Sequence, residues 1–174
     1  EVAASVAAQK LGNYIVDVSG KLRLMAGQAS ALGAASPDAH DFLDRIARHD
    51  LDRNWVSAIY LVGAEFPDTG RPRRAFRFDD DLRDTVAEGE GGQTARPGAG
   101  QWREIAEHLA AYRDGRELAC RISRTLMLAN GRLGQILSAP VRAADGRIEG
   151  LVAALLPTTF QTDQLNVSSA ETGK

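Results

Sequence analysis

Side chains suited to binding a small anion stand close together in the segment from residue 118 to 157. Arg121, Ser123 and Thr125 occupy alternate positions, so in a β-strand they share one face. Ser138 joins that face if the run that contains it pairs with the first run. A guanidinium beside hydroxyls suits a carboxylate or a similar anion, because arginine forms bidentate, charge-assisted hydrogen bonds that survive partial desolvation.

No catalytic constellation accompanies these residues. The sequence has no paired carboxylates, HExxH motif or Ser-His-Asp pattern that would indicate an enzyme. His40 and His49 lack the spacing of metal ligands, and no GxxxxGK[ST] phosphate loop is present. Cys120 is the only cysteine, which argues against an internal disulfide and a thiolate metal cluster in this stretch of chain. We therefore expect no catalytic residues, no metal and no cofactor.

Three strands joined by two tight turns would position the anion site. Asn130-Gly131 and Asp145-Gly146 tolerate the positive φ of two-residue type I′ turns, and each separates apolar, β-rich runs. Such turns place Ser123 opposite Ser138, and Ser138 opposite Ala153. The meander then has a core face and an amphipathic face. We expect the core face to carry Cys120, Ile122, Leu126, Leu137, Ala139, Val141, Ile148, Val152, Ala154 and Leu156, and the amphipathic face to carry Arg121, Ser123, Thr125, Ser138, Arg142 and Glu149 among apolar residues.

A helix of about three turns is expected before the meander. Trp102, Ile105, Ala106, Leu109 and Tyr112 follow a helical stripe, and His108 lies one position from it. Gly115 would end this helix. The glycine-rich stretch 88–100 before it predicts a mobile flap.

The N-terminal part predicts a long helix over residues 1–34. Its apolar residues recur with heptad spacing from Ala4 through Leu11, Val18 and Met25 to Leu32, and this predicts a helix of about 50 Å. Such a helix is longer than a small domain, so we expect part of the seam to pack on the sheet and part to meet a second subunit. A core helix without a dimer remains the alternative.

Shorter elements complete the chain. Ser36 and Pro37 are suited to the N-cap and first position of a short helix. Residues 55–62 predict a strand, 66–72 a loop, and 73–78 an edge strand. We expect Asp79-Asp80-Asp81 to form an exposed cap or a charged rim rather than a cation site. An exit helix starting at Thr158 or Thr159 would follow the meander.

Composition fits one globular domain. The chain has 174 residues, 44% of them hydrophobic, and a net charge of −2, which gives no reason to expect nucleic acid as a partner. No apolar run reaches the ~20 residues of a membrane helix. The chain starts with Glu1 rather than Met, so we expect it to be a piece of a longer protein.

The order of elements resembles the bacterial extracytoplasmic PAS-like sensor domains of the single Cache or PDC type. The strand at 57–62, the stretch Cys120–Arg124 and the stretch Leu137–Ala154 carry the likeness. The last is similar to the family's usual ending, in which a "pv…dG…G" hairpin leads into a final strand and an exit helix.

The resemblance implies an α+β fold, a PAS-like antiparallel five-stranded sheet with the long N-terminal helix on one face and a ligand pocket on the other. It implies a single sensor domain over 1–174, with the long helix at 1–34, sheet and covering helix at 55–157, and exit helix and frayed tail at 158–174. The family's ligand lies under the covering helix, where we expect Arg121, Ser123, Thr125, Ser138, Tyr60, Trp102, His108 and Tyr112 to line the pocket.

It also implies a periplasmic domain of an inner-membrane receptor, with a transmembrane helix on either side. The parent would be a sensor histidine kinase, a diguanylate cyclase or a chemoreceptor, and the domain would bind an organic acid or amino acid and form a homodimer through its N-terminal helix. The sequence departs from the amino-acid-binding pattern, because the full Arg, Trp, Tyr and Asp set of that pattern cannot be placed.

Other interpretations stay open at this point. Arg121 could be a surface ion-pair partner, Trp102 and Tyr112 could be core cover, and Arg142 and Glu149 oppose each other as a cross-strand ion pair in the expected register. The domain could be a dimerisation and signal-relay module with an empty or vestigial pocket, or a cofactor-binding PAS domain or enzyme.

Overall fold

The computed structural model describes residues 2–49, 56–77, 99–117, 119–127 and 133–158. None of the helices in these ranges is both long and apolar enough to cross a membrane. The elements in chain order are α1 (Val2–Leu32), α2 (Pro37–His49), β1 (Ala58–Gly63), α3 (Phe66–Thr69), β2 (Arg74–Arg77), α4 (Ala99–Arg113), β3 (Arg121–Ile122), β4 (Leu126–Met127), β5 (Leu133–Arg142) and β6 (Ile148–Pro157).

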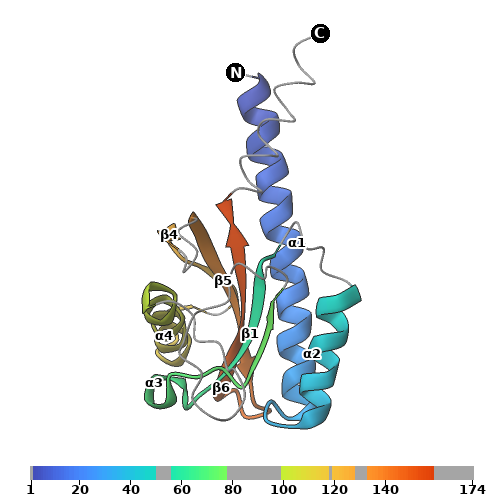
Figure 1. Ribbon diagram of the computed structural model, residues 1–174, viewed down its shortest axis with the longest axis vertical. Helices are drawn as coiled ribbons and strands as arrows, with labels where there is room; N and C mark the ends of the chain where they lie inside the picture. The colour runs from blue at the N-terminus through green and yellow to red at the C-terminus, as the bar shows by residue number, and fades with distance from the viewer. Residues whose placement is uncertain (1, 50–55, 78–98, 118, 128–132, 159–174) are drawn as a thin grey trace.

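The strands form one antiparallel sheet in the order β2-β1-β6-β5-β3, and β4 also pairs with β5. The strand expected at the start of the meander is thus divided into β3 and β4, which share the edge position beside β5. The α+β class and the antiparallel sheet with five strand positions are confirmed. Helices α1 and α2 lie on one face of the sheet, and α3 and α4 lie on the other (Figure 1).

Helix α1 packs on the sheet through the C-terminal half of the expected seam. Val18, Leu22, Met25 and Ala29 are 0% exposed and contact the apolar side chains of the central strands. The N-terminal turns of α1 extend past the sheet, at the end of the molecule toward which β6 runs (Figure 1). Ala8 is accordingly exposed, so the seam divides into a packed half and an unpacked half.

The α1–α2 junction follows the expected capping chemistry. Gly33 has a φ of 83°, which glycine adopts without steric cost at a helix end. The Ser36 Oγ accepts a hydrogen bond from the Ala39 N–H at 3.1 Å, and Pro37 begins α2. Serine at the N-cap and proline at the first helical position are confirmed.

The opposite face of the sheet packs against α4 and α3. Its buried cluster includes Tyr60, Ile136, Leu151 and Leu155 from the strands, with Phe66, Ile105, Leu109 and Tyr112 from the helices. Strands β1 and β6 approach closely at Gly150, where a Cβ atom would lie 2.0 Å from the Val62 carbonyl oxygen. A side chain there would separate the two central strands.

The expected register of the first hairpin is wrong by two residues at β3. Arg121, not Ser123, lies opposite Ser138. The register changes again at β4, where Leu126 pairs with Gly134. Because each one-residue slip moves a side chain to the other face, Leu126 packs in the α4-side cluster rather than on the expected α1 side.

The second hairpin has the expected register from Ser138 to Val141 and departs from it at the turn. Ala143 N–H donates to the Arg147 carbonyl at 2.8 Å, and only Gly146 has a positive φ there, so the turn is not the expected type I′. A bulge follows and pairs Arg142 with Ile148. The predicted Arg142–Glu149 opposition is therefore wrong, and Ile148 packs on the α4 side.

Two element boundaries also differ from expectation. Residues 66–69, expected as loop, form the single helical turn α3, and residues 99 and 100 of the expected flap belong to α4. The remainder of the flap, Trp55, the Asp79–Asp81 run, the Asn130-Gly131 turn and the exit helix beyond Thr158 lie outside the described residues.

Candidate functional site: a buried polar cluster under helix α4

A cross-strand row on the α4 side of the sheet carries most of the polar chemistry. Tyr60 of β1 pairs with Ala153 of β6, Ala153 pairs with Ser138 of β5, and Ser138 pairs with Arg121 of β3. Directly opposed residues share one face, so these side chains form a line across four strands. The small Ala153 separates the aromatic ring of Tyr60 from the hydroxyl of Ser138.

Helix α4 adds two polar side chains to this row. His108 and Tyr112 are one helical turn apart, so both point from the same side of α4. The His108 Nδ1 lies 2.8 Å from the Ser138 Oγ. The Tyr112 hydroxyl donates to the Ser138 carbonyl at 2.8 Å and lies 3.0 Å from the Ser138 Oγ. Ser138 therefore links the sheet to two positions of the helix.

The protons of this cluster can be arranged in two ways. With the Tyr112 proton on the Ser138 carbonyl, the single Ser138 proton goes either to the His108 Nδ1 or to the Tyr112 oxygen. In the first arrangement the His108 Nε2 carries a proton and is a donor, and in the second it is a bare acceptor. The cluster can thus match either kind of group placed beside the Nε2.

His108 is neutral at physiological pH in this environment. The side chain is 0% exposed, and burial, with a smaller contribution from the nearby Arg121 charge, lowers its pKa from 6.5 to about 4. A buried imidazole next to a guanidinium loses both hydration and electrostatic support for its own charge. Arg121 therefore supplies the positive charge of the cluster, and His108 supplies a neutral polar group.

Two buried nitrogen atoms in this cluster have no hydrogen-bond partner among the described residues. They are the Nε2 of His108 and the Nε of Arg121. An unsatisfied buried polar atom costs about 1–3 kcal/mol, and such atoms call for an explanation in a native fold.

Three of the expected pocket residues are placed differently. The Ser123 Oγ accepts from the Ile136 N–H and donates to the Arg124 carbonyl, so it holds the break between β3 and β4. Thr125 is exposed. Trp102 packs edge-on against Phe66 with ring centroids 4.1 Å apart. The structure brings together Arg121, Ser138, His108 and Tyr112, with Tyr60 in the same row.

Two buried polar residues of α4 were not predicted. Glu104 is 6% exposed and Gln101 is 2% exposed. Glu104 pairs with Arg124 at 3.1 Å and so ties α4 to the segment between β3 and β4. With His108 and Tyr112 these residues follow steps of three and four, a polar stripe beside the apolar one, and this spacing is the signal that could have identified them.

Comparison with solved structures places this geometry in a known fold. The ligand-binding domain of the amino acid chemoreceptor PctC of Pseudomonas aeruginosa PAO1, in complex with GABA, is 20% identical, with a TM-score of 0.60 over 94% of this chain and 64% of that one. An extracellular ligand binding receptor from Desulfohalobium retbaense is 19% identical, with a TM-score of 0.65 over 95% of this chain and 26% of that one. The chain has a PAS-like fold of the Cache type.

The chemoreceptor CtaA of Pseudomonas fluorescens, whose ligand-binding domain was solved with L-serine, is 14% identical, with a TM-score of 0.57 over 92% of this chain and 58% of that one. The chain spans less than two thirds of the length of each of these three structures. No protein-family model matches the sequence, and no curated protein sequence matches it. The likeness to the Cache type is therefore one of fold.

Proposed function

We propose that this domain is the extracytoplasmic ligand-sensing part of a bacterial transmembrane signalling protein, and that it binds a small organic acid or amino acid between α4 and the sheet. The fold is shared with domains that were solved with GABA and L-serine. The polar cluster of Arg121, Ser138, His108 and Tyr112 lies on the sheet face that α4 covers.

The unpartnered nitrogen atoms of Arg121 and His108 are the observation that carries the proposal. A ligand carboxylate would accept from the Arg121 Nε and, in one proton arrangement, from the His108 Nε2. The interaction is favourable because a charge-assisted hydrogen bond replaces an unsatisfied buried donor. Because His108 stays neutral, it adds a hydrogen bond without a second buried charge.

Helix α1 is the element suited to relay the signal. It packs against β5 and β6. The opposite face of these two strands carries Ser138 and Ala153. The N-terminal turns of α1 extend beyond the sheet. A ligand that binds one arrangement of α4 and the sheet more tightly than another would increase the population of that arrangement. Helix α1 would pass this change toward a transmembrane helix. The output would be a histidine kinase or a diguanylate cyclase.

The same helix offers a surface for a homodimer. Val16 and Leu24 are 72% and 56% exposed, and Val6, near the N-terminal end of α1, is 37% exposed. Sedimentation at increasing protein concentration tests this part: a monomer–dimer equilibrium weakened by Val16→Asn supports the dimer, and a monomer at every concentration contradicts it.

Ligand binding is tested by a thermal-shift screen of organic acids and amino acids, followed by calorimetry of each compound that stabilises the domain. We expect at least one carboxylate compound to raise the melting temperature. Arg121→Gln should weaken its binding at least about tenfold, a change of ~1.4 kcal/mol.

Arg103→Gln is the matched control, since Arg103 is an exposed residue of α4 outside the cluster. Arg121→Lys tests the guanidinium, because lysine keeps the charge but cannot form the planar fork. If no compound stabilises the wild type, or if Arg121→Gln and Arg103→Gln bind the hit equally well, the proposed ligand site is wrong.

A further inference from the structure

An arginine-lined cleft lies at the end of the molecule where the α1–α2 turn, the β5–β6 hairpin and the end of α4 meet. Its volume is about 830 Å³, within the range of small-molecule sites. Four arginines from separate parts of the fold line it, together with one acidic side chain, Glu149. The arginines are Arg73, Arg113, Arg142 and Arg147.

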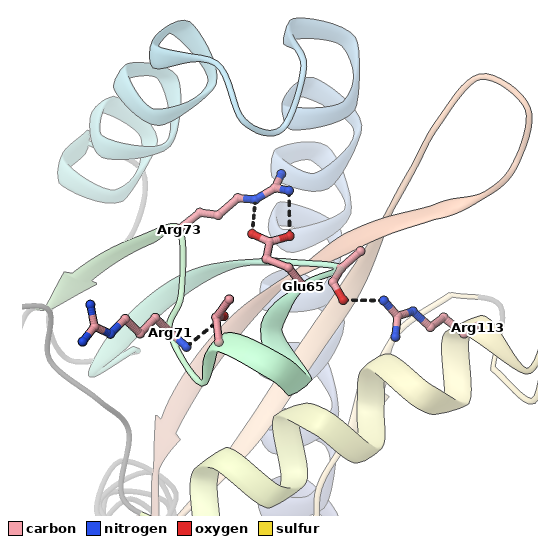
Figure 2. A network of polar contacts seen from close by, with 6 residues as sticks. Glu65, Arg71, Arg73 and Arg113 are labelled. Atoms are coloured by element: carbon pink, nitrogen blue, oxygen red, sulfur yellow. Dashed lines mark hydrogen bonds and ion pairs between the residues drawn. The ribbon is translucent and has the colours of Figure 1, made fainter.

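One of these arginines is held by a fixed ion pair. Arg73 donates to both carboxylate oxygens of Glu65, at 2.7 and 2.8 Å, and this hydrogen bonding lowers the pKa of Glu65 (Figure 2). The pair lies directly over Gly63, where a Cβ atom would be 2.2 Å from the Glu65 carboxylate and 2.3 Å from the Arg73 Nε. Glycine at this position therefore leaves room for the ion pair, of which Arg73 lines the cleft.

Two other arginines form no ion pair with the described residues. The Arg113 guanidinium donates to the Ala64 carbonyl, a neutral acceptor, and points from α4 toward the Glu65–Arg73 pair (Figure 2). The Arg147 side chain is exposed and makes no hydrogen bond or ion pair with the described residues. The bond to Ala64 orients Arg113 without neutralising it.

The charge balance of the cleft is opposite to that of the chain. Four arginines line it, Glu149 is the one acidic residue among the lining residues, and the neighbouring Glu65 is paired with Arg73, whereas the whole chain has a net charge of −2. Converging arginines suit oxyanions, because each guanidinium can donate two parallel hydrogen bonds to a carboxylate or phosphate. We propose that this cleft binds a small molecule that carries two or more oxyanion groups.

This site is separate from the polar cluster under α4. Of the cluster residues only Tyr112 lines the cleft, and its hydroxyl is engaged with Ser138 on the other side. The cleft ligand is therefore an additional ligand of the domain, and its binding does not depend on Arg121.

The test is calorimetric titration of the 174-residue chain with pyrophosphate and with citrate, at constant ionic strength, with acetate as the single-carboxylate comparison. We expect saturable binding of one polyanion with a Kd below about 1 mM, and weaker or no binding of acetate. The tighter of the two compounds identifies phosphate or carboxylate as the preferred group.

Variants locate the site. Arg147→Gln and Arg113→Gln should each weaken polyanion binding at least about fivefold, and Glu149→Gln should strengthen it about twofold or more, because it removes a negative charge from the cleft. Arg71→Gln is the matched control, because the Arg71 side chain points away from the Glu65–Arg73 pair (Figure 2). Arg121→Gln should leave the affinity unchanged.

Two outcomes would overturn the proposal. One is the absence of saturable binding of both polyanions, and the other is equal weakening by Arg71→Gln and Arg147→Gln, which would indicate a general charge effect. Circular dichroism of each variant checks that the fold is retained. Arg147→Gln removes no side-chain hydrogen bond or ion pair with the described residues, so the test does not depend on a variant that unfolds.

Discussion

The two faces of the central sheet differ in what they bury. On the α1 side, Leu22, Met25, Leu137 and Val152 belong to an apolar cluster that also buries the ring of Tyr14. On the α4 side, an apolar cluster of similar kind surrounds His108 and Ser138, both 0% exposed. The same strands β5 and β6 contribute to both.

The same sheet supports an apolar cluster on one face and a cluster with buried polar groups on the other. Apolar packing stabilises the fold, because each buried apolar group contributes in proportion to the surface area that it removes from water. A buried polar network stabilises only when every member has a partner, and two nitrogens of the α4-side cluster lack one among the described residues. On the other face, the described residues leave one such atom without a partner, the Nε2 of His40 in α2. We therefore assign most of the stability to the apolar cluster on the α1 side, and the proposed ligand site to the α4 side.

Truncation on the α1 side should cost the most. Leu22→Ala removes a side chain that is 0% exposed, and we expect the free energy of unfolding to fall by about 2–5 kcal/mol, from lost burial and the cavity left behind. Gln28→Ala, at an exposed position of the same helix, should change it by less than ~0.5 kcal/mol. Urea unfolding measures both. Equal effects of the two variants would contradict the described orientation of α1.

The α4 side should make stability depend on pH through His108. Its pKa is about 4 in the folded domain, against 6.5 for an unperturbed histidine side chain, so between these values the unfolded chain binds a proton that the folded domain does not. The stabilisation is fully present above pH 6.5 and is lost as the pH falls toward 4. The loss amounts to about 2–3 kcal/mol at pH 4.5, relative to pH above 6.5.

His108→Gln removes this titration and keeps a polar side chain. Urea unfolding of both proteins at pH 7.5 and 4.5 measures the effect, since the other titrating groups are common to both. A wild type that loses no more stability than the variant on acidification would show that His108 is not buried as a neutral group.

Loss of the Tyr112 hydroxyl should have a smaller effect. Tyr112→Phe keeps the ring in the apolar cluster and removes the hydrogen bonds to the Ser138 carbonyl and Oγ, so we expect a loss of about 1–2 kcal/mol. A double-mutant cycle with Ser138→Ala isolates the hydroxyl–hydroxyl term, which we expect to be about 0.5–1 kcal/mol. Strict additivity would mean that the two hydroxyls do not interact.

Ion pairs on the two faces should contribute least to the free energy of unfolding. Arg74 pairs with Asp44 on the α2 side, and Arg124 pairs with Glu104 on the α4 side. The arginine side chains are 46% and 74% exposed, so Arg74→Gln and Arg124→Gln should each cost less than ~1 kcal/mol, and less still at high salt. A loss above ~2 kcal/mol for either variant would indicate a more strongly desolvated pair.

Local chemistry explains which parts of the fold could be predicted. The α1 seam from Val18 to Ala29, the Ser36–Pro37 cap and the antiparallel meander depend on periodicity and on the conformational preferences of single residues. Arg121 was assigned to the correct face although its register was wrong by two residues, because side-chain orientation repeats every two residues along a strand. The one-residue shifts at β4 and at the β5–β6 bulge reversed the faces of Leu126 and Ile148.

Parts of the candidate site could be found only in three dimensions. The contact of His108 with Ser138 depends on where α4 crosses the sheet, and no local pattern specifies that position. The burial of Glu104 and Gln101 has the same cause. The arginine cleft joins residues from β5, the β5–β6 turn, the start of β2 and the end of α4, which lie far apart along the chain.

Sequence patterns alone predict helices α1, α2 and α4, the meander, the polar side chains available for an anion and the face that most of them occupy. These features follow from spacing and from the stereochemistry of individual residues. The tertiary structure decided which polar groups meet, which nitrogens of Arg121 and His108 lack partners among the described residues, and that His108 is neutral. Those properties depend on burial and on distances between separate elements, because desolvation and charge interactions are set by every group packed around an atom.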